Sequence, residues 1–408
     1  MKRIRFEKLD RALILSSLGL VLMGLVLLYH VQSFEMSGPP EIFWRQLAYA
    51  VIGLALMIGV AVMSPRVHFA LAYVIYGVSV AILLGIFLWG SVAKGAVRWI
   101  DLGLFTFQPS EPAKIGLTLA LARLVTDKKF DLRRPGHLLR AAALTAFPLM
   151  LVMAQPDLGT SIVFGSIFLS MMVVAGTPLS YLLILVSPAL AAITSFHALA
   201  FLLFMAGLVF ISWRMKFPLL VTILLVMGNL LVSAATPLAW NQLKPYQQKR
   251  LITFVNPEAD PKGAGYQVIQ SKVAVGSGGL LGKGLGQGSQ TQLKFLPEQH
   301  TDFIFSVVGE ETGLLGGSLI IILYALLISR GFAAAALCSG KYARLTCVGL
   351  SSLLAAHIFI NIGMAIGLLP VTGLPLPYLS YGGSFLWTSM ISGGIILGIQ
   401  FRKGDYTP

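Results

Sequence analysis

The chain has 408 residues, of which 56% are hydrophobic and only 11% charged, with a net charge of +14. The charged share is about half that of an ordinary soluble domain, which excludes a soluble globular protein. Apolar runs of 16 to 29 residues take up nearly the whole length and leave no room for an independent soluble domain. Because about 20 apolar residues cross a hydrocarbon core, the composition predicts an all-α, polytopic integral membrane protein.

Twelve apolar runs are predicted to be transmembrane helices. They occupy residues 12–31, 45–63, 69–90, 110–126, 140–155, 158–176, 180–195, 197–213, 217–238, 302–330, 343–367 and 384–401. The stretch 180–213 is also compatible with one span and a re-entrant piece, since Pro188 and the residues around His197 favour a break. A retained first helix is predicted in place of a cleaved signal peptide.

Lys and Arg residues gather in the short connections on one side of these runs, near residues 2–8, 66, 128–140, 214–216, 330–344 and 402–403. By the positive-inside rule both termini are predicted to be cytoplasmic. Residues 32–44, 91–109, 239–301 and 368–383 are then predicted to lie outside. Cys338 and Cys347 fall on the cytoplasmic side, where a structural disulfide is not expected.

The long outer loop, residues 239–301, is itself basic. Loops of this length follow the charge rule only weakly, so its charge does not overturn the orientation. Its cations are a solvated surface or, taken as a set, a binding surface for an anionic ligand at the outer leaflet. They are Lys244, Lys249, Arg250, Lys262, Lys272, Lys283 and Lys294.

The segment AVRWIDLGLFTFQPSEPAK, residues 96–114, forms a polar cluster before an apolar run. Ser110 is predicted to cap the helix, and Glu111 and Lys114, one turn apart, to pair. Arg98 and Trp99 precede them on the outer side. The cluster is either an interfacial Trp with a neutralised ion pair at a helix end or the wall of an outer cavity.

Two further polar clusters lie at turns between spans. In QPDLGT, residues 155–160, Asp157 is predicted to cap the following helix. The Pro- and Gly-rich segment 367–384 has irregular backbone, which is tolerated near membrane depth only when it is buried in protein or lines a wet cavity. His357 and Asn361, one turn apart on the preceding span, are predicted to satisfy each other or a neighbouring backbone.

The glycine-rich run GSGGLLGKGLGQG, residues 276–288, does not match either of the common nucleotide-binding glycine patterns. Glycines let a backbone approach a ligand or another backbone closely. The run is therefore interpreted either as the flexible lining of a ligand groove or as plain turns.

Asp302 is the first candidate for chemistry. It follows Glu298 and His300 at the point where the long loop enters an apolar run. Ionisable groups at membrane depth cost roughly 2.5–3.5 kcal/mol each, so they usually face a polar cavity and carry function. The alternative is a helix cap, and of Glu310 and Glu311 at most one can share a cavity with Asp302. No His, Cys or Asp spacing indicates a structural metal site.

Several of these segments together resemble the SEDS family of cell-wall polymerases, and its RodA-type elongation proteins more than its FtsW-type division proteins. The resemblance covers most of the chain and rests on RWIDLG with QPSEPAK, QPDLGTS, the stretch from NPEADPKG to HTDFIF, GEE and LPLPYLSYGGS. It implies a single all-helical domain over residues 1–408, usually of ten spans, so residues 180–238 look one helix pair longer. It places the catalytic aspartate at Asp302, and it places cavity residues at Arg98, Trp99, Glu111, Lys114, Asp157, Lys272, Glu298, His300 and the segment from Ser380 to Ser384.

The resemblance implies a peptidoglycan glycosyltransferase of the bacterial cytoplasmic membrane that polymerises lipid II outside during cell elongation. Asp302 would be the general base of an inverting transfer, and Arg98 and lysines, with Mg²⁺ or Mn²⁺ as a candidate helper, would neutralise the leaving pyrophosphate. The implied partners are membrane lipid, a class B penicillin-binding protein and the rod-shape complex, with no nucleic acid. Buried charges between broken helices also suit a lipid flippase or transporter, and a non-catalytic scaffold for a transpeptidase is a third reading.

Overall fold

The computed structural model describes residues 10–33, 41–89, 91–93, 96–101, 103, 105–243, 245–260, 263–293 and 295–402. The predicted cations of residues 2–8, Lys244, Lys262, Lys294 and Lys403 lie outside these ranges. The chain divides into two compact units, Met172–Lys249 and the remainder. The expectation of a single domain over the whole chain stays a prediction.

The larger unit is almost entirely helical and carries all the candidate site residues. In chain order its elements are α1 (Arg11–Ser33), α2 (Glu41–Val62), α3 (Pro65–Trp89), β1 (Ser91–Ala93), β2 (Ala96–Asp101), β3 (Thr106–Phe107), α4 (Ser110–Thr126), α5 (Pro135–Ala154), most of α6 (Leu158–Ala175) and of α10 (Pro245–Val255), η2 (Pro257–Ala259), α11 (Ala264–Ser277), α12 (Ser289–Gln292), α13 (Ile304–Leu337), α14 (Lys341–Ala365) and α15 (Gly383–Phe401).

Each apolar run predicted from the sequence is a helix, with ends that differ by several residues at most. This confirms the all-α polytopic membrane fold. Of the helices in the described residues, nine are long and apolar enough to cross a membrane. The other three predicted spans are α4, α7 (Leu179–Thr194) and α8 (Ala198–Arg214). They have only 16 or 17 residues, which is short of the usual spanning length.

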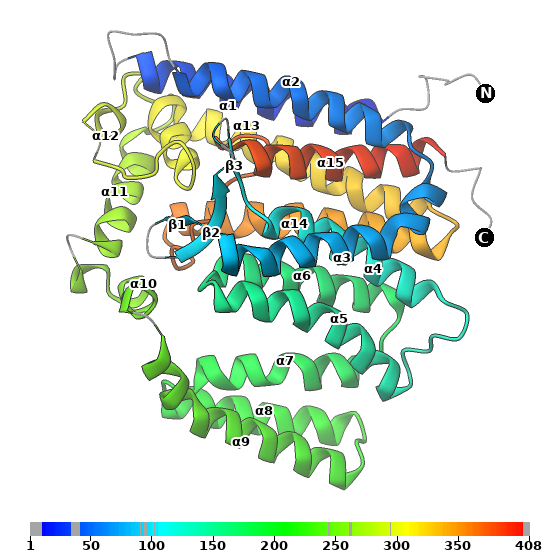
Figure 1. Cartoon of the computed structure of the whole chain (residues 1–408). Coiled ribbons are helices and arrows are strands. Elements are labelled where there is room, and N and C mark those ends of the chain that lie inside the picture. The colour runs from blue at the N-terminus through cyan, green and yellow to red at the C-terminus, as the bar shows by residue number, and fades with distance from the viewer. Residues whose placement is uncertain are drawn as a thin grey trace. The chain divides into compact units, whose positions relative to one another are not determined.

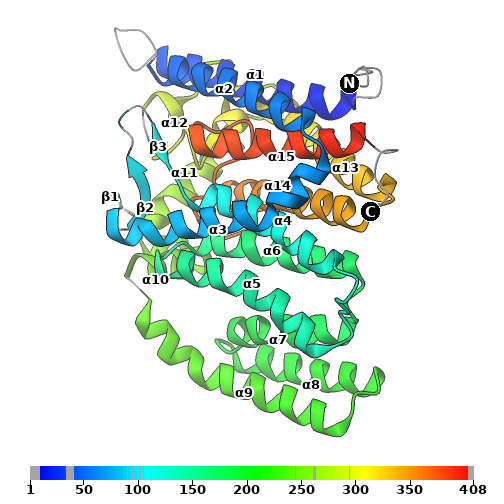
Figure 2. The same ribbon diagram turned by 45° about the vertical axis from the view of Figure 1, so that its right-hand side comes forward.

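Helix α14 lies at the centre of the larger unit and packs against α4, α13 and α15, while α15 packs along α2 and α1 packs on α13. In Figures 1 and 2, α14 and α15 lie between α2 on one side and α3 and α5 on the other. Small residues allow these close approaches. A β carbon on Gly394 of α15 would lie 2.5 Å from the Met57 carbonyl of α2. The polar side chains on α14 therefore face other protein groups.

Helix α13 is broken at Gly313, whose φ of 63° and ψ of −160° are not helical. The glycine-rich run docks into this break through backbone hydrogen bonds: Lys283 N to Glu310 O and Gly284 N to Glu311 O at 3.0 Å, Leu314 N to Gly279 O at 2.9 Å, and Leu315 N to Leu280 O at 3.2 Å. A β carbon on Gly282 would lie 2.2 Å from the Glu311 carbonyl. The glycines thus serve backbone pairing with a broken helix, a role that neither sequence interpretation had specified.

A small antiparallel sheet, in the order β1-β2-β3, forms within the connection between α3 and α4. Trp99 is opposite Ser91, and Ile100 is opposite Phe107. The sequence predicted only an outer loop here. The sheet holds the backbone of Arg98 and Trp99, both on β2, and β2 packs against α3.

The smaller unit contains α7 (Leu179–Thr194), α8 (Ala198–Arg214) and α9 (Leu219–Gln242), which pack on one another. The helical structure is interrupted between α7 and α8 at residues 195–197. The His197 side chain caps α8 by accepting a hydrogen bond from Ala200 N. Asn229 of α9 donates to Ser187 of α7 at 3.0 Å in the interior of this unit. Residues 180–213 are therefore two separate helices, as the twelve-helix reading predicts.

Candidate functional site

Asp302 lies in a turn, residues 298–303, that is tied to the Pro- and Gly-rich loop 367–382. Ser380 Oγ donates to Thr301 O at 2.6 Å, and Tyr381 N donates to His300 O at 2.9 Å. Asn361 Nδ2 on α14 donates to both Asp302 O at 2.8 Å and Leu374 O at 2.6 Å. These bonds fix the backbone of Asp302 against the loop.

The Asp302 side chain is half-buried and does not occupy the helix-capping position. Phe303 is the N-cap of α13, and no side chain caps the helix there. A β carbon on Gly373, whose φ is 74°, would lie 3.3 Å from Asp302 Oδ2 and 3.8 Å from Arg250 Nη1. Glycine at this position therefore leaves room for a carboxylate and a guanidinium beside the loop.

Lys114 of α4 is completely buried and links two helices. Its Nζ lies 2.8 Å from Glu111 Oε1 and 2.8 Å from His357 Nε2 on α14. The other ring nitrogen of His357 lies 3.4 Å from the Pro375 carbonyl of loop 367–382. The predicted pair of Glu111 and Lys114 is confirmed, and it extends through His357 to the same loop that holds Asp302.

Arg98 reaches from β2 to the turn before α6. Its Nε donates to Gln155 O at 2.9 Å, a second nitrogen donates to Pro156 O, and Nη1 lies 3.9 Å from Asp157 Oδ2. Asp157 caps α6 as predicted, accepting from Thr160 N at 3.1 Å. The next residues touch the loop as well, because a β carbon on Gly159 would lie 3.0 Å from Thr372 Cβ.

Loop 367–382 is thus the common neighbour of most predicted site residues. The turn with Glu298, His300 and Asp302 is bonded to this loop, which also contains Ser380. The Glu111–Lys114 pair is connected to the loop through His357. The turn with Asp157, to which Arg98 is bonded, contacts the loop at Gly159. Lys272 on α11 is exposed, and its Cε lies 2.8 Å from a β carbon built on Gly367. Trp99 lies next to Arg98 on β2, and Ser384 lies at the start of α15, directly after the loop. Only their positions in the chain assign them to the site.

Burial raises the pKa of Tyr378 well above its usual range, and its hydroxyl donates to Ser389 O of α15 at 2.7 Å. This tyrosine therefore stays protonated and anchors the loop to α15. Gln46 of α2 anchors the other end, because it donates to Ser380 O at 3.1 Å and accepts from Gly382 N at 3.1 Å.

The site contains residues to which the sequence analysis gave no chemical role. His357 and Asn361 were expected only to bond each other or nearby backbone, and both do contact carbonyl groups. Arg250 was one of seven basic loop residues with nothing to single it out. Their contacts with residues far away in the chain, Lys114 for His357 and Asp302 for Asn361, cannot be predicted from a single sequence.

Glu310 has a structural task away from Asp302. Its buried carboxylate accepts from Lys283 Nζ at 2.7 Å, from Gln290 N at 3.0 Å and from the Thr291 hydroxyl at 3.1 Å. It therefore fastens residues 283–291 to α13. Lys283, one of the predicted anion-binding cations, is occupied by this contact.

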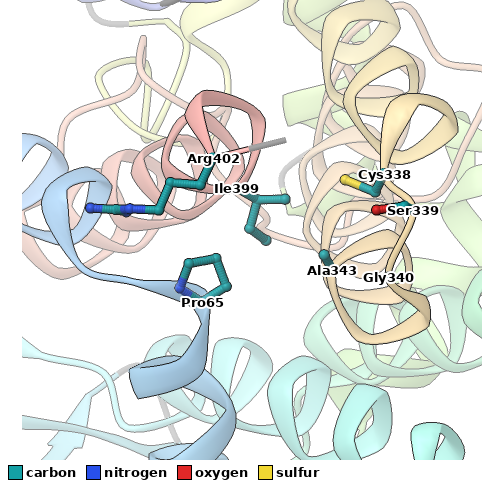
Figure 3. Close-up of a pocket in the computed structure, with 7 residues that line it drawn as sticks. All are labelled: Pro65, Cys338, Ser339, Gly340, Ala343, Ile399 and Arg402. Atoms are coloured by element: carbon teal, nitrogen blue, oxygen red, sulfur yellow. The ribbon is translucent and has the colours of Figure 1, made fainter. Parts of the chain in front are cut away.

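A small pocket at the other end of α13 does not belong to this site. Figure 3 shows it lined by residues of α3, the α13–α14 junction and α15: Pro65, Cys338, Ser339, Gly340, Ala343, Ile399 and Arg402. The pocket lies at the end of α13 opposite Asp302, beyond the break at Gly313. Cys338 and Cys347 are both buried and form no disulfide within the described residues.

The residues around Asp302 do not fit a metal ion held by protein ligands alone. Within the described ranges no three His, Cys, Asp or Glu side chains are grouped so as to hold one. The charged group that approaches the Asp302 carboxylate at Gly373 is the guanidinium of Arg250, which is not a metal ligand. A role for Mg²⁺ or Mn²⁺ stays a prediction.

The sequence matches the FtsW, RodA and SpoVE family of cell cycle proteins over residues 10–206 and again over 192–404. The chain belongs to this family. As a family member it is 40% identical over 362 residues to the peptidoglycan glycosyltransferase MrdB of Escherichia coli K12, a match that covers 88% of this chain and 85% of that protein. It is 33% identical to the peptidoglycan glycosyltransferase RodA of Treponema pallidum, covering 97% of this chain and 98% of the relative.

Solved structures of family members have the same fold over nearly the whole length. The crystal structure of the rod shape determining protein RodA of Thermus thermophilus aligns with a TM-score of 0.64 at 27% identity, covering 97% of this chain and 98% of that one. A chain from a structure described as the coordination of polymerization and crosslinking by a peptidoglycan synthase complex gives a TM-score of 0.72 at 29% identity, covering 98% and 99%. These matches confirm the family and its RodA type. The two matched stretches of the family overlap at residues 192–206, within the segment that looked one helix pair longer than usual.

Proposed function

We propose that this RodA-type family member is a peptidoglycan glycosyltransferase that polymerises lipid II during cell elongation. The observation that carries the proposal is the placement of Asp302: its backbone is fixed by Asn361, and its carboxylate faces the gap left by Gly373 next to a guanidinium. The activity named for the similar MrdB and RodA proteins supports the same class of reaction.

In the proposed reaction, Asp302 accepts the proton of the acceptor sugar's 4-hydroxyl while that oxygen attacks the anomeric carbon of the donor. The bond between this carbon and the pyrophosphate oxygen breaks, and the leaving group takes the electron pair. Attack from the side opposite the leaving group inverts the anomeric configuration. Pyrophosphate leaves as a stabilised anion, so a single carboxylate suffices.

The cations have separate roles in this proposal. Lys114 is completely buried and bonded to both Glu111 and His357, so it organises α4 and α14 and contributes its charge from a distance. Arg98 is bound to carbonyls of the 155–156 turn and stabilises that wall. Contacts of substrate with Trp99, Lys272, Glu298, His300, Ser380 and Ser384 stay predictions.

We further propose that the end of the molecule with Asp302 faces outward from the bacterial cytoplasmic membrane, with both termini inside. The distribution of Lys and Arg supports this orientation. A class B penicillin-binding protein within the rod-shape complex is the proposed partner. The similarity to a chain from a peptidoglycan synthase complex that couples polymerization with crosslinking supports it.

The test is glycan synthesis from purified lipid II by the purified protein together with its transpeptidase partner, in detergent and in liposomes. Glycan strands from the wild type in detergent, where no membrane separates two compartments, support a polymerase. Movement of lipid II across liposomes without strands would instead favour the flippase. A requirement for a divalent cation is tested in the same assay by adding EDTA and then Mg²⁺ or Mn²⁺.

A further inference from the structure

Arg250 lies on α10 and faces the site, whereas its neighbour Lys249 is exposed. Its Nη1 and Asp302 Oδ2 lie 3.8 Å and 3.3 Å from the same point, the position of a β carbon on Gly373. The guanidinium and the carboxylate therefore both border the same point on loop 367–382. This juxtaposition is separate from the Lys114 and Arg98 contacts.

Three other cations predicted for the site, Lys283, Lys114 and Arg98, are bonded to other protein groups in the described structure. Lys283 is bonded to Glu310 at 2.7 Å, and Lys114 is bonded to Glu111 at 2.8 Å. Arg98 is bonded to Gln155 O at 2.9 Å, and the ammonium of Lys272 lies beside Gly367. Within the described residues, Arg250 is a cation that borders the same point of the loop as the proposed base.

A guanidinium beside a carboxylate hinders that carboxylate as a base, because the positive charge favours the ionised form. A guanidinium also binds phosphate groups in a bidentate way, and a pyrophosphate carries more negative charge than one carboxylate. The pyrophosphate of a donor bound at this place would therefore bind the Arg250 guanidinium in preference to the Asp302 carboxylate.

We propose that Arg250 restrains the Asp302 carboxylate before substrate binds and is then taken over by the pyrophosphate of the lipid-linked donor, which leaves Asp302 able to accept the proton. This inference rests on the proposed glycosyltransferase function. It assigns one arginine to the anionic part of the donor. It also couples activation of the base to the presence of the correct leaving group.

The test compares Arg250→Ala and Arg250→Lys with the wild type and with Lys249→Ala, the matched loss of a positive charge on the exposed neighbour. All are assayed as the complex with the transpeptidase. We expect Arg250→Ala to raise two constants, each by about tenfold or more, since one charge-assisted contact is lost. These are the KM for lipid II and the inhibition constant of the product undecaprenyl pyrophosphate. Arg250→Lys should restore part of both, and Lys249→Ala should stay within about twofold.

Two results would overturn the inference. One is an Arg250→Ala enzyme with reduced kcat but unchanged KM and unchanged product inhibition, which would indicate a structural role. The other is an equal effect of Lys249→Ala, which would indicate diffuse charge. Thermal unfolding of each variant checks folding, and if Arg250→Ala does not fold, Arg250→Lys and Arg250→Gln decide by the same two constants.

Failure of the proposed function is distinguishable from failure of this inference. If the wild type makes no glycan, binding of undecaprenyl pyrophosphate is measured directly by its effect on thermal unfolding of the wild type and Arg250→Ala. A shift in the wild type that is lost in Arg250→Ala supports the anion site even without polymerisation. Equal shifts, or no shift in either protein, reject it.

Discussion

Replacing Lys114 with Met tests how the buried ion pair supports the site. Lys114 is 0% exposed and Glu111 2% exposed, and Glu111 Oε2 has no hydrogen-bond partner. Removing the ammonium would leave a buried carboxylate with no counter-charge. Loss of one partner of a buried pair costs about 3–5 kcal/mol. For a chain of this size we expect the melting temperature to fall by roughly 3–6 °C.

The double variant Glu111→Gln with Lys114→Met removes both charges and should recover a large part of this loss. The coupling between the two changes is expected to be about 2–3 kcal/mol, because the uncompensated charge accounts for most of the single-variant cost. Thermal unfolding in one detergent at one pH is measured for the wild type, Lys114→Met, Glu111→Gln and the double variant. Lys341→Met, which removes an exposed lysine at the first residue of α14, should change stability by only about 0.5 kcal/mol.

Polymerisation should fall in Lys114→Met even at a temperature where the variant is folded, since His357 loses its partner and loop 367–382 loses one support. The reasoning is refuted if Lys114→Met is as stable and as active as the wild type. It is also refuted if the double variant loses the sum of the two single losses.

Three further outcomes follow from contacts outside the ion pair. Asn361→Ala should lower kcat by about tenfold to a hundredfold by releasing the backbone of Asp302. The control is Asn229→Ala, which changes a buried asparagine of the smaller unit and should lower stability without a specific loss of kcat. Equal effects of the two variants on kcat would contradict the positioning role of Asn361. Glu310→Ala should free residues 283–291, so limited proteolysis should cut this segment faster than in the wild type, and unchanged cleavage would contradict it. Although burial acts to raise the pKa of Asp10, hydrogen bonds from Gln400 and Arg330 lower it below its usual 3.8; its carboxylate therefore stabilises the fold above that value and loses the effect as pH falls through the lowered pKa. Asp10→Asn keeps an acceptor for the start of α1 but loses the negative charge beside Arg330. It should thus cost about 1 kcal/mol at pH 7 and progressively less in acid, and a cost independent of pH would contradict this.

The helices were predictable because a membrane imposes one length and one composition on each span. All twelve runs appear as helices, even the short α7 and α8, where a Ser-Phe-His break separates two apolar runs. The Asp157 cap and the pair of Glu111 and Lys114 were also predictable, because these partners are three residues apart. The prediction that Ser110 caps its helix is wrong, because Pro109 is the N-cap of α4 and no side chain of the described residues caps that helix. The sheet in residues 91–107 was not predicted, since its strands are only two to six residues long.

Long-range polar partners could not be predicted. Lys114 meets His357 across 243 positions and Asn361 meets Asp302 across 59, and nothing local marks either contact. The sequence showed no nucleotide-loop pattern in the glycine-rich run, but it did not indicate what the run contacts. Its true task depends on the break at Gly313, which exposes carbonyls that the loop then satisfies.

The most direct test of the account is lipid II polymerisation by Asp302→Asn beside the wild type and Glu258→Gln. The control removes an exposed carboxylate from the same outer loop with an equally small change of shape. Each protein is matched for folding and for assembly with the transpeptidase. The account predicts glycan strands from the wild type and from Glu258→Gln and none from Asp302→Asn. Equal product from the wild type and Asp302→Asn would contradict the assignment of Asp302 as the base.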